Sequence, residues 1–337
     1  MVLHDAHRRR RCALGERLFS LVLISSVPLA SLHAQISTSS CILSIAELQA
    51  ALDSRNFGVG LIDGRDGPRT RGALLDYCRA ERVSEVTGRK MLLEGTSPLL
   101  TSYLITEEDL QVGLSPADWM EASEMQTMSY TSLDEVLSEK FHTSRGLLAH
   151  LNPGITNWNT VVRGQSITLL AFNPVNRSPN ANLLEIDCTS YRLRVYDSEN
   201  RLVASFPCSI AKNFQKIPVG ELRLVAFAPN PNYTFDPANF PESARAQEIG
   251  RKLILPPGPN NPVGSYWLSL SLPGFGIHGT PYPETIGRSE SHGCFRLTNW
   301  DITHLARTVI AGTPVRILAP AGKVAIPIND AIQQNKP

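Results

Sequence analysis

Two histidines and a cysteine lie close together in a glycine-rich stretch near the C-terminal end of the chain. His278 precedes a loop with two prolines, and His292, Gly293 and Cys294 follow that loop. A thiol attacks as its thiolate, and a free cysteine has a pKa of about 8.5, so a nearby imidazole or backbone N–H donors must activate it. The types and spacing predict a nucleophile, Cys294, beside a general base, His278.

The same residue types could also bind a metal ion or have a purely structural role. His278, His292 and Cys294 would supply three zinc ligands, but the chain has no Cys-x-x-Cys or His-x-x-x-His pair and no obvious fourth ligand. Each residue taken alone is more typical of a buried small thiol or a hydrogen-bonded core histidine. We therefore expect a thiol site with no metal and no cofactor.

The motif His-Gly-Thr from position 278, followed by Ser-His-Gly-Cys-Phe-Arg-Leu from position 291, resembles the signature of the L,D-transpeptidase catalytic domain. In that family a cysteine attacks a carbonyl of a peptidoglycan stem tetrapeptide and passes the acyl group to an amine. The resemblance implies that Cys294 is the nucleophile and His278 the base, oriented by the carbonyl of Gly279. The positions that it assigns to the substrate and the oxyanion are Gly279, Ser291, His292, Gly293 and Arg296.

The resemblance implies peptidoglycan as the partner, through its stem peptides and glycan strands. Three alternatives remain open. Water as the acceptor would make the same site an L,D-carboxypeptidase, an idle site would leave a wall-binding protein, and a thiol protease would cleave polypeptides. The net charge of +1 gives no reason to expect a nucleic acid.

A sheet is expected to position the site within a catalytic domain at 180–320. Segments 183–187, 191–196 and 202–206 read as successive antiparallel strands, and 265–270 and 275–278 read as strands that lead to His278. A helix from 300 to 311 and a strand at 315–318 follow, with a C-terminal tail at 321–337. The fold class is multidomain α+β, with a mainly antiparallel β catalytic domain behind smaller modules.

Residues 44–82 are predicted to form a helical module. Ser44 and Glu47 make a capping-box pattern, and Thr70 stands where it would cap a second helix. The glycines around Asp63 and the apolar spacing resemble the small helical peptidoglycan-binding domain, with a hairpin that binds nothing as the alternative. Residues 86–127 have poor periodicity and are expected to be a linker.

Residues 128–171 resemble a lysin motif, a strand-helix-helix-strand module that binds glycans containing N-acetylglucosamine. Ser132 and Glu135 form another capping-box pattern ahead of two apolar helices, and a strand at 165–170 ends the module. The alternative is a packing domain that holds no sugar.

The first residues are typical of a signal peptide. A basic run at 7–11 precedes an apolar stretch that continues to Ala34, so cleavage is expected there, with an uncleaved anchor as the alternative. The protein is then exported to the periplasm or cell wall, with no membrane contact after cleavage.

Export places the cysteines in an oxidising compartment. Loss of Cys12 leaves five, an odd number. The local pairing would join Cys41 to Cys78 and Cys188 to Cys208 and leave the nucleophile free. The alternative is that all four are buried thiols.

Overall fold

The structure is a computed structural model that describes residues 29–94, 100–171, 180–240, 243–291, 293–319 and 326–327. The chain divides into two compact units after Ser39, within helix α1 (Leu29–Asp53). The elements that bear on the site belong to the second unit. Within the described ranges, no helix has the length and apolar character that a membrane crossing requires. Most of the signal peptide expected at 1–34 lies outside these ranges and stays a prediction.

Helices α1, α2 (Pro68–Glu81) and α3 (Glu85–Leu93) pack around a small apolar core that includes Leu52 and Leu74. Gln49, which is buried, joins α1 to the loop before α2. Its amide nitrogen donates to the Asp63 carboxylate at 2.9 Å, and its oxygen accepts from the Asp63 N–H at 2.9 Å. These bonds satisfy polar groups that would otherwise be costly to bury.

Two capping predictions in this module are wrong. Helix α1 continues through Ser44, whose hydroxyl donates back to the Cys41 carbonyl at 3.0 Å. Helix α2 begins at Pro68, so Thr70 lies inside it, where its hydroxyl accepts from Gln49 at 2.9 Å. Proline is well suited to a first helical position because its fixed φ matches the helix and it has no N–H to leave unpaired.

The strand, two helices and strand that were predicted for the second module are present, but the module begins earlier than expected. Strand β1 (Leu100–Leu104) pairs antiparallel with β2 (Ser166–Leu170), and helices α5 (Leu133–Lys140) and α6 (Arg145–Leu151) lie between them in the sequence. A 3-10 turn at Trp158–Thr160 precedes β2. The first strand therefore lies inside the segment 86–127 that was expected to be a linker. At the start of α5, Glu135 accepts from the N–H of Thr131 at 2.7 Å, and Ser132 makes no side-chain cap bond.

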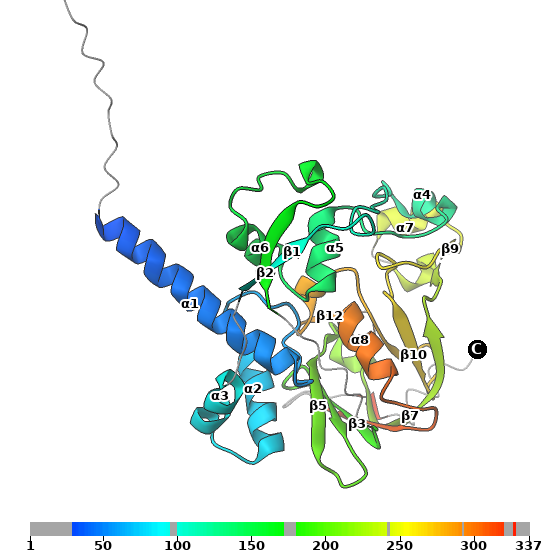
Figure 1. The fold of residues 1–337 in the computed structure, drawn as a ribbon. Coiled ribbons are helices and arrows are strands. Elements are labelled where there is room, and N and C mark those ends of the chain that lie inside the picture. Colours follow the sequence, from blue (N-terminus) through cyan, green and yellow to red (C-terminus); the bar gives the residue numbers. More distant parts are fainter. Residues whose placement is uncertain are drawn as a thin grey trace, which may run out of the picture. The chain divides into compact units, whose positions relative to one another are not determined.

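The connection from β1 to α5 is also structured, and we call its residues 114–131 the arm. Helix α4 (Trp119–Glu124) lies in the arm and packs against β9 (Leu253–Leu255), beside α7 (Ala244–Ile249) (Figure 1). Strand β8 (Tyr233–Phe235) pairs with β9 and completes this cluster. The arm thus packs against a part of the catalytic region that lies more than a hundred residues later in the sequence.

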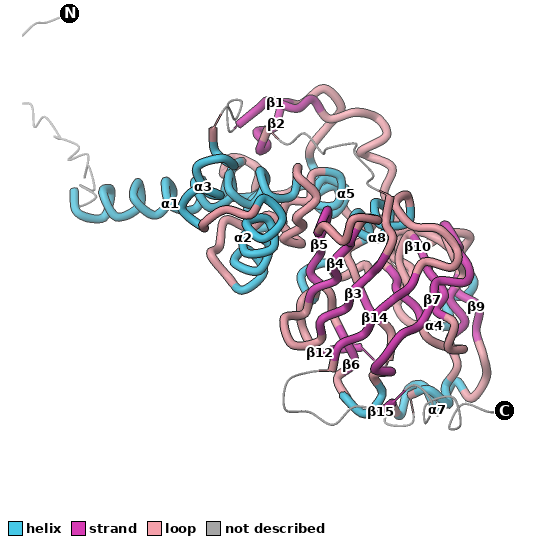
Figure 2. The backbone as a smooth tube through the Cα atoms, turned by 90° about the horizontal axis from the view of Figure 1, so that it is seen from below, coloured by secondary structure: helices cyan, strands magenta, loops and turns pink. Residues whose placement is uncertain are grey.

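A large, mainly antiparallel sheet forms the catalytic region, as predicted, and Figure 2 shows its strands from β5 to β7 side by side. Helix α8 (Asn299–Ala306) packs on the sheet and buries Ile302 and Leu305 in its core (Figure 1). Across the sheet the strands are β13 (Phe295–Arg296), β11 (Gly276–His278), β10 (Tyr266–Leu270), β7 (Pro218–Pro229), β14 (Pro314–Leu318), β3 (Leu183–Asp187), β4 (Arg192–Tyr196) and β5 (Leu202–Pro207), and β15 (Ile326–Pro327) pairs with β7. A separate pair consists of β6 (Ile210–Ala211) and β12 (Ser289–Ser291), and 3-10 turns lie at Phe214–Lys216, Pro237–Asn239 and Pro283–Thr285.

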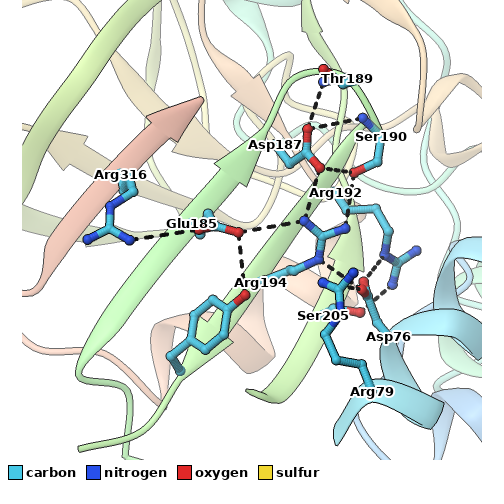
Figure 3. Close-up of polar contacts among 11 residues, drawn as sticks. Asp76, Arg79, Glu185, Asp187, Thr189, Ser190, Arg192, Arg194, Ser205 and Arg316 are labelled. Carbon is cyan, nitrogen blue, oxygen red and sulfur yellow. Dashed lines mark hydrogen bonds and ion pairs between the residues drawn. The ribbon is translucent and has the colours of Figure 1, made fainter. Parts of the chain in front are cut away.

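Ion pairs join helix α2 to the catalytic sheet (Figure 3). Asp76 on α2 accepts from Arg192 Nε at 2.7 Å and from Arg194 Nε at 2.8 Å, both on β4. All three side chains are buried, and Arg194 also contacts Asp187 at 3.0 Å. Because a buried charge requires a close partner, these contacts fix the helical module against β4.

The disulfides expected from the cysteine count are not present. Cys41, Cys78, Cys188 and Cys208 are all free thiols. Strand β4 lies between β3 and β5, so the chain at Cys188 is two strand spacings from Cys208, about 9.5 Å, which exceeds the reach of a disulfide. Cys41 is exposed, whereas Cys78 is buried with its sulfur beside Gly88 of α3. The alternative of buried thiols therefore holds for Cys78, Cys188 and Cys208 but not for Cys41, which is exposed.

Candidate active site

His278 ends strand β11 in a buried position. Its Nδ1 lies 2.6 Å from the carbonyl oxygen of Gly279, an atom that only accepts hydrogen bonds. Nδ1 must therefore carry the proton in this ring orientation, which leaves the lone pair on Nε2. The Trp267 ring on β10 stacks on the imidazole with centroids 5.3 Å apart, and a Cβ at Gly276 would come within 2.5 Å of that indole. Glycine at 276 thus makes room for the ring that holds the imidazole.

Strand register brings His278 next to the chain that follows Cys294. Strands β11 and β13 are parallel, with His278 opposite Arg296. The Leu297 N–H donates to the His278 carbonyl at 2.9 Å and extends this pairing. Only Phe295 separates Cys294 from Arg296, so the predicted nucleophile and base belong to neighbouring strand ends.

The sulfur of Cys294 lies against backbone groups of the loop that leads into β11. It accepts a hydrogen bond from the Gly276 N–H and is 3.7 Å from the Gly274 carbonyl oxygen. Burial raises the pKa of Cys294 to about 11, although the Gly276 bond and the Arg296 charge act in the opposite direction. The raised pKa favours the protonated thiol at neutral pH, so a base must take its proton when it reacts.

The electrostatics of His278 also favour a neutral group. Burial lowers the pKa of its imidazole to about 3, and the Arg296 charge lowers it further, while the bond to Gly279 opposes the change. A buried cation far from a carboxylate is unfavourable, so the ring stays neutral. Neutral imidazole is the form that accepts a proton.

A short segment at 209–211 forms backbone hydrogen bonds with the chain before and after Cys294, and we call it the brace. The N–H of Ser209 donates to the Arg296 carbonyl, and the Arg296 N–H donates to the Ser209 carbonyl, each at 2.9 Å. On the other side, β6 pairs in parallel with β12, with Ala211 opposite Ser291. The Ser209 hydroxyl also donates to the Thr285 carbonyl at 3.0 Å. These bonds fix the two ends of the turn relative to each other.

Tyr233 on β8 is an electrostatic neighbour of both Cys294 and Arg296. Burial raises the pKa of its phenol, Cys294 raises it further and Arg296 lowers it. Trp119 of the arm lies close by, with its ring 6.4 Å from Tyr233 and stacked on Phe235 at 5.1 Å. The arm therefore supports a side chain that adjoins the thiol.

The structure brings most of the expected site residues together. Arg296 interacts with both His278 and Cys294, Gly279 contacts the imidazole, and Gly293 lies near the ring of Phe275. The backbone of Ser291 pairs with Ala211 of β6, and His292 lies outside the described residues. In the part of the chain that the structure describes, no group of His, Cys, Asp and Glu residues is arranged to hold a metal ion.

Four contributions were missed by reasoning from the sequence: Trp267, Tyr233, Trp119 and the brace at Ser209. Trp267 lies on a strand that was predicted to lead to the base, so the sequence pattern of that strand could have indicated that Trp267 lies near His278. The others lie 61 to 175 positions before Cys294 in the sequence, and nothing local connects them with it. Their position near Cys294 becomes visible only when distant segments of the chain pair in the folded structure.

Comparison with known proteins supports one assignment. The YkuD family model, described as the L,D-transpeptidase catalytic domain, matches residues 181–317. The YkuD protein of Bacillus licheniformis, which is named as an L,D-transpeptidase, is 33% identical over 54% of this chain and 92% of its own length. Its counterpart in Bacillus subtilis is 28% identical over 54% of this chain and 90% of its own.

Among solved structures, an L,D-transpeptidase from Mycobacterium smegmatis is 20% identical over 47% of this chain and 65% of that one, with a TM-score of 0.33. That likeness is too low to add to the assignment. The sequence relationships are sufficient, because a relative with one-third identity is covered almost completely. The chain therefore belongs to the L,D-transpeptidase family of enzymes.

Proposed function

We propose that this protein is an exported acyltransferase of peptidoglycan that carries the acyl group of a stem peptide on Cys294 as a thioester. Family membership supports the reaction class. The observation that carries the assignment to these residues is the parallel pairing of β11 with β13, which aligns His278 with the chain just after Cys294. The neutral imidazole, with its lone pair on Nε2, is suited to accept the thiol proton.

The proposed reaction has two halves. The Cys294 sulfur attacks the stem carbonyl while His278 Nε2 takes its proton; the C–N bond then breaks, and His278 returns the proton to the leaving amine. The acceptor amine next attacks the thioester carbonyl and passes a proton to His278, and the proton returns to the departing sulfur as the C–S bond breaks. Because the resting thiol is protonated, proton transfer accompanies the attack.

The other assigned residues have supporting roles in this proposal. The turn at Ser291, His292 and Gly293 supplies backbone N–H groups to the oxyanion. Arg296 binds a carboxylate of the donor stem, and its guanidinium is suited to a two-bond contact. The helical and lysin-like modules hold the enzyme on the wall polymer.

Mass spectrometry of purified peptidoglycan tests the proposal. Cells that express the full chain should contain crosslinks or protein attachments that are absent with Cys294→Ala. Cys41→Ala, at an exposed thiol, serves as the matched control and should behave as the wild type. Shortened stems without new links would show water as the acceptor. Identical peptidoglycan from the wild type and Cys294→Ala would count against an active enzyme.

A further inference from the structure

A cavity of about 590 Å³ lies where the helical module, the lysin-like module and the catalytic region meet. Its volume is in the range of small-molecule sites, which often form at domain junctions. Neither Cys294 nor His278 is among its lining residues. Leu61 of the helical module and Met128 of the arm supply apolar surface, and Asn260 of the catalytic region supplies an amide. The polar and aromatic lining that the argument uses consists of Tyr130, Glu135, Glu139, Arg145, Tyr282 and Glu284.

The lining carries more negative than positive charge. Arg145 contacts the carboxylate of Glu135 at 3.7 Å and that of Asp134 at 3.5 Å, so its charge is already matched. Glu139 and Glu284 have no cationic partner among the described residues. The amide of Asn299 is a hydrogen-bonding neighbour of Glu139. Two carboxyl groups from different modules are thus available to a ligand.

Aromatic side chains accompany these carboxyl groups. Tyr282 is 60% exposed, and its ring forms part of the wall beside Glu284. The hydroxyl of Tyr130 makes no hydrogen bond within the described part of the chain. Aromatic rings cover the carbon skeleton of a ligand, and a phenol oxygen accepts a hydrogen bond from it.

We propose that this cavity is a binding site for a primary ammonium group on a polar ligand, held between Glu139 and Glu284 and covered by the two tyrosine rings. An ammonium has three N–H donors, and the two carboxylates and the Tyr130 oxygen supply three acceptors. Peptidoglycan, the substrate in the proposed function, offers two sources of such a group: the free side-chain amine of a stem peptide and the amine of a de-acetylated glycan. The choice of these two ligands rests on the proposed function, whereas the binding site itself is argued from the residues that line the cavity.

Proton release provides a distinctive signature of this binding. Burial raises the pKa of Glu139 to about 8, and the Glu135 charge raises it too, while Asn299 opposes them. In the empty cavity at pH 7 its carboxyl is therefore mostly protonated. An ammonium ligand favours the carboxylate, so binding should release close to one proton. The other charged groups that line the cavity are Glu284 and the matched Arg145.

Titration calorimetry of the full chain with Cys294→Ala tests the site without any acyl transfer. Four probes are needed: a stem tetrapeptide with a free amine on its third side chain, the same peptide acetylated there, a glucosamine tetramer and its N-acetylated form. At least one free-amine probe should bind, and its acetylated partner should bind ten-fold more weakly or worse. Measurements at pH 7 in two buffers of different ionisation enthalpy should give a release near one proton.

Glu139→Gln should remove the proton release, and Glu139→Gln and Glu284→Gln should each weaken binding by ten-fold or more. Glu284 is exposed, so its replacement leaves the fold intact. Glu108→Gln, at an exposed position of the lysin-like module outside the cavity, should change nothing. Failure of both free-amine probes to bind, or equal affinity for an acetylated partner, would overturn the proposal. Such a failure leaves the peptidoglycan experiment unaffected, since binding is measured without catalysis.

Discussion

Burial and the charge of Arg296 act together on His278 but oppose each other at Cys294. Both lower the pKa of the imidazole, to about 3, whereas burial raises that of the thiol, to about 11. The pair is therefore neutral over the whole range between these values. This arrangement avoids a buried charge in the resting protein. It also makes the reactivity of the thiol depend on pH in a measurable way.

Alkylation should reveal the protonated thiol. With a pKa of about 11, the thiolate fraction of Cys294 at pH 7.5 is below about one in a thousand. Iodoacetamide should therefore modify Cys294 much more slowly than the exposed Cys41, and its rate should rise about ten-fold for each pH unit up to pH 11. Peptide mapping at timed intervals measures both rates. Fast modification of Cys294 at pH 7.5 would indicate a thiolate instead.

The stability of the protein should decrease as the pH is lowered, because of His278. Its folded pKa of about 3 is below the value of 6.5 for an ordinary histidine, so between these values the unfolded chain takes up a proton that the folded chain does not. From pH 7 to pH 4.5 this one group should lower the free energy of unfolding by about 2–3 kcal/mol. His278→Asn removes that contribution, so urea titrations should show a shallower decline. Equal slopes for variant and wild type would contradict the pKa.

The sequence was enough to name the proposed reacting groups, but not the residues that support them. The thiol, the imidazole and Arg296 could be named because they lie within one short stretch of sequence, from 278 to 296. The contacts of Tyr233 and Ser209 depend on how β8 and β6 approach that motif, which no local pattern encodes. The pKa values were also beyond prediction, because burial sets them and burial belongs to the folded chain.

At the scale of elements, strands were predicted better than helix ends and connections. The alternation at 191–196 predicted β4, and β3 and β5 were predicted as its neighbours along the chain. The capping predictions failed because Thr70 lies inside α2 and accepts from Gln49, while Ser44 lies inside α1 and donates to the Cys41 carbonyl. Residues 114–127 of the arm were taken for a linker because the arm buries its apolar residues against β8 and β9 rather than in a repeating pattern of its own.

The arm predicts an effect on the site from a residue in another module. Trp119→Ala removes the ring that stacks on Phe235 and lies near Tyr233. We expect faster hydrogen exchange in β8 and β9 and roughly ten-fold slower acylation of Cys294, because a neighbour of the thiol loses its support. Exchange in β3 and β4 should not change.

Trp119→Phe is the matched control, because it keeps an aromatic ring and should retain most of the protection. Exchange mass spectrometry and a single-turnover acylation assay supply the two readouts. Unchanged exchange in β8 and β9 after Trp119→Ala would mean that the arm does not hold this hairpin.

At the scale of the whole molecule, the helical module is continuous with the catalytic sheet. The Gly58 N–H donates to the Ser205 carbonyl of β5 at 2.8 Å, and Leu202 of β5 belongs to the same apolar core as Leu52 and Leu74. His142, at the end of α5, lies 2.7 Å from Asp53 and stacks on Trp300 of α8. A wall polymer that binds the helical module must therefore use a surface other than the one facing β5.

This continuity predicts that one ion-pair centre controls the stability of the unit. Asp76→Asn leaves the buried guanidinium groups of Arg192 and Arg194 without their shared carboxylate, which should lower the free energy of unfolding by about 3–5 kcal/mol. Asp66→Asn breaks an exposed pair with Arg71 near the start of the same helix and should cost less than about 1 kcal/mol. The helical module and the catalytic sheet both depend on the Asp76 ion pairs. Fluorescence and circular dichroism should therefore report one coincident unfolding transition, which moves to lower urea concentration in Asp76→Asn. Two separate transitions in the wild type, or equal effects of the two substitutions, would show that the helical module folds independently of the sheet.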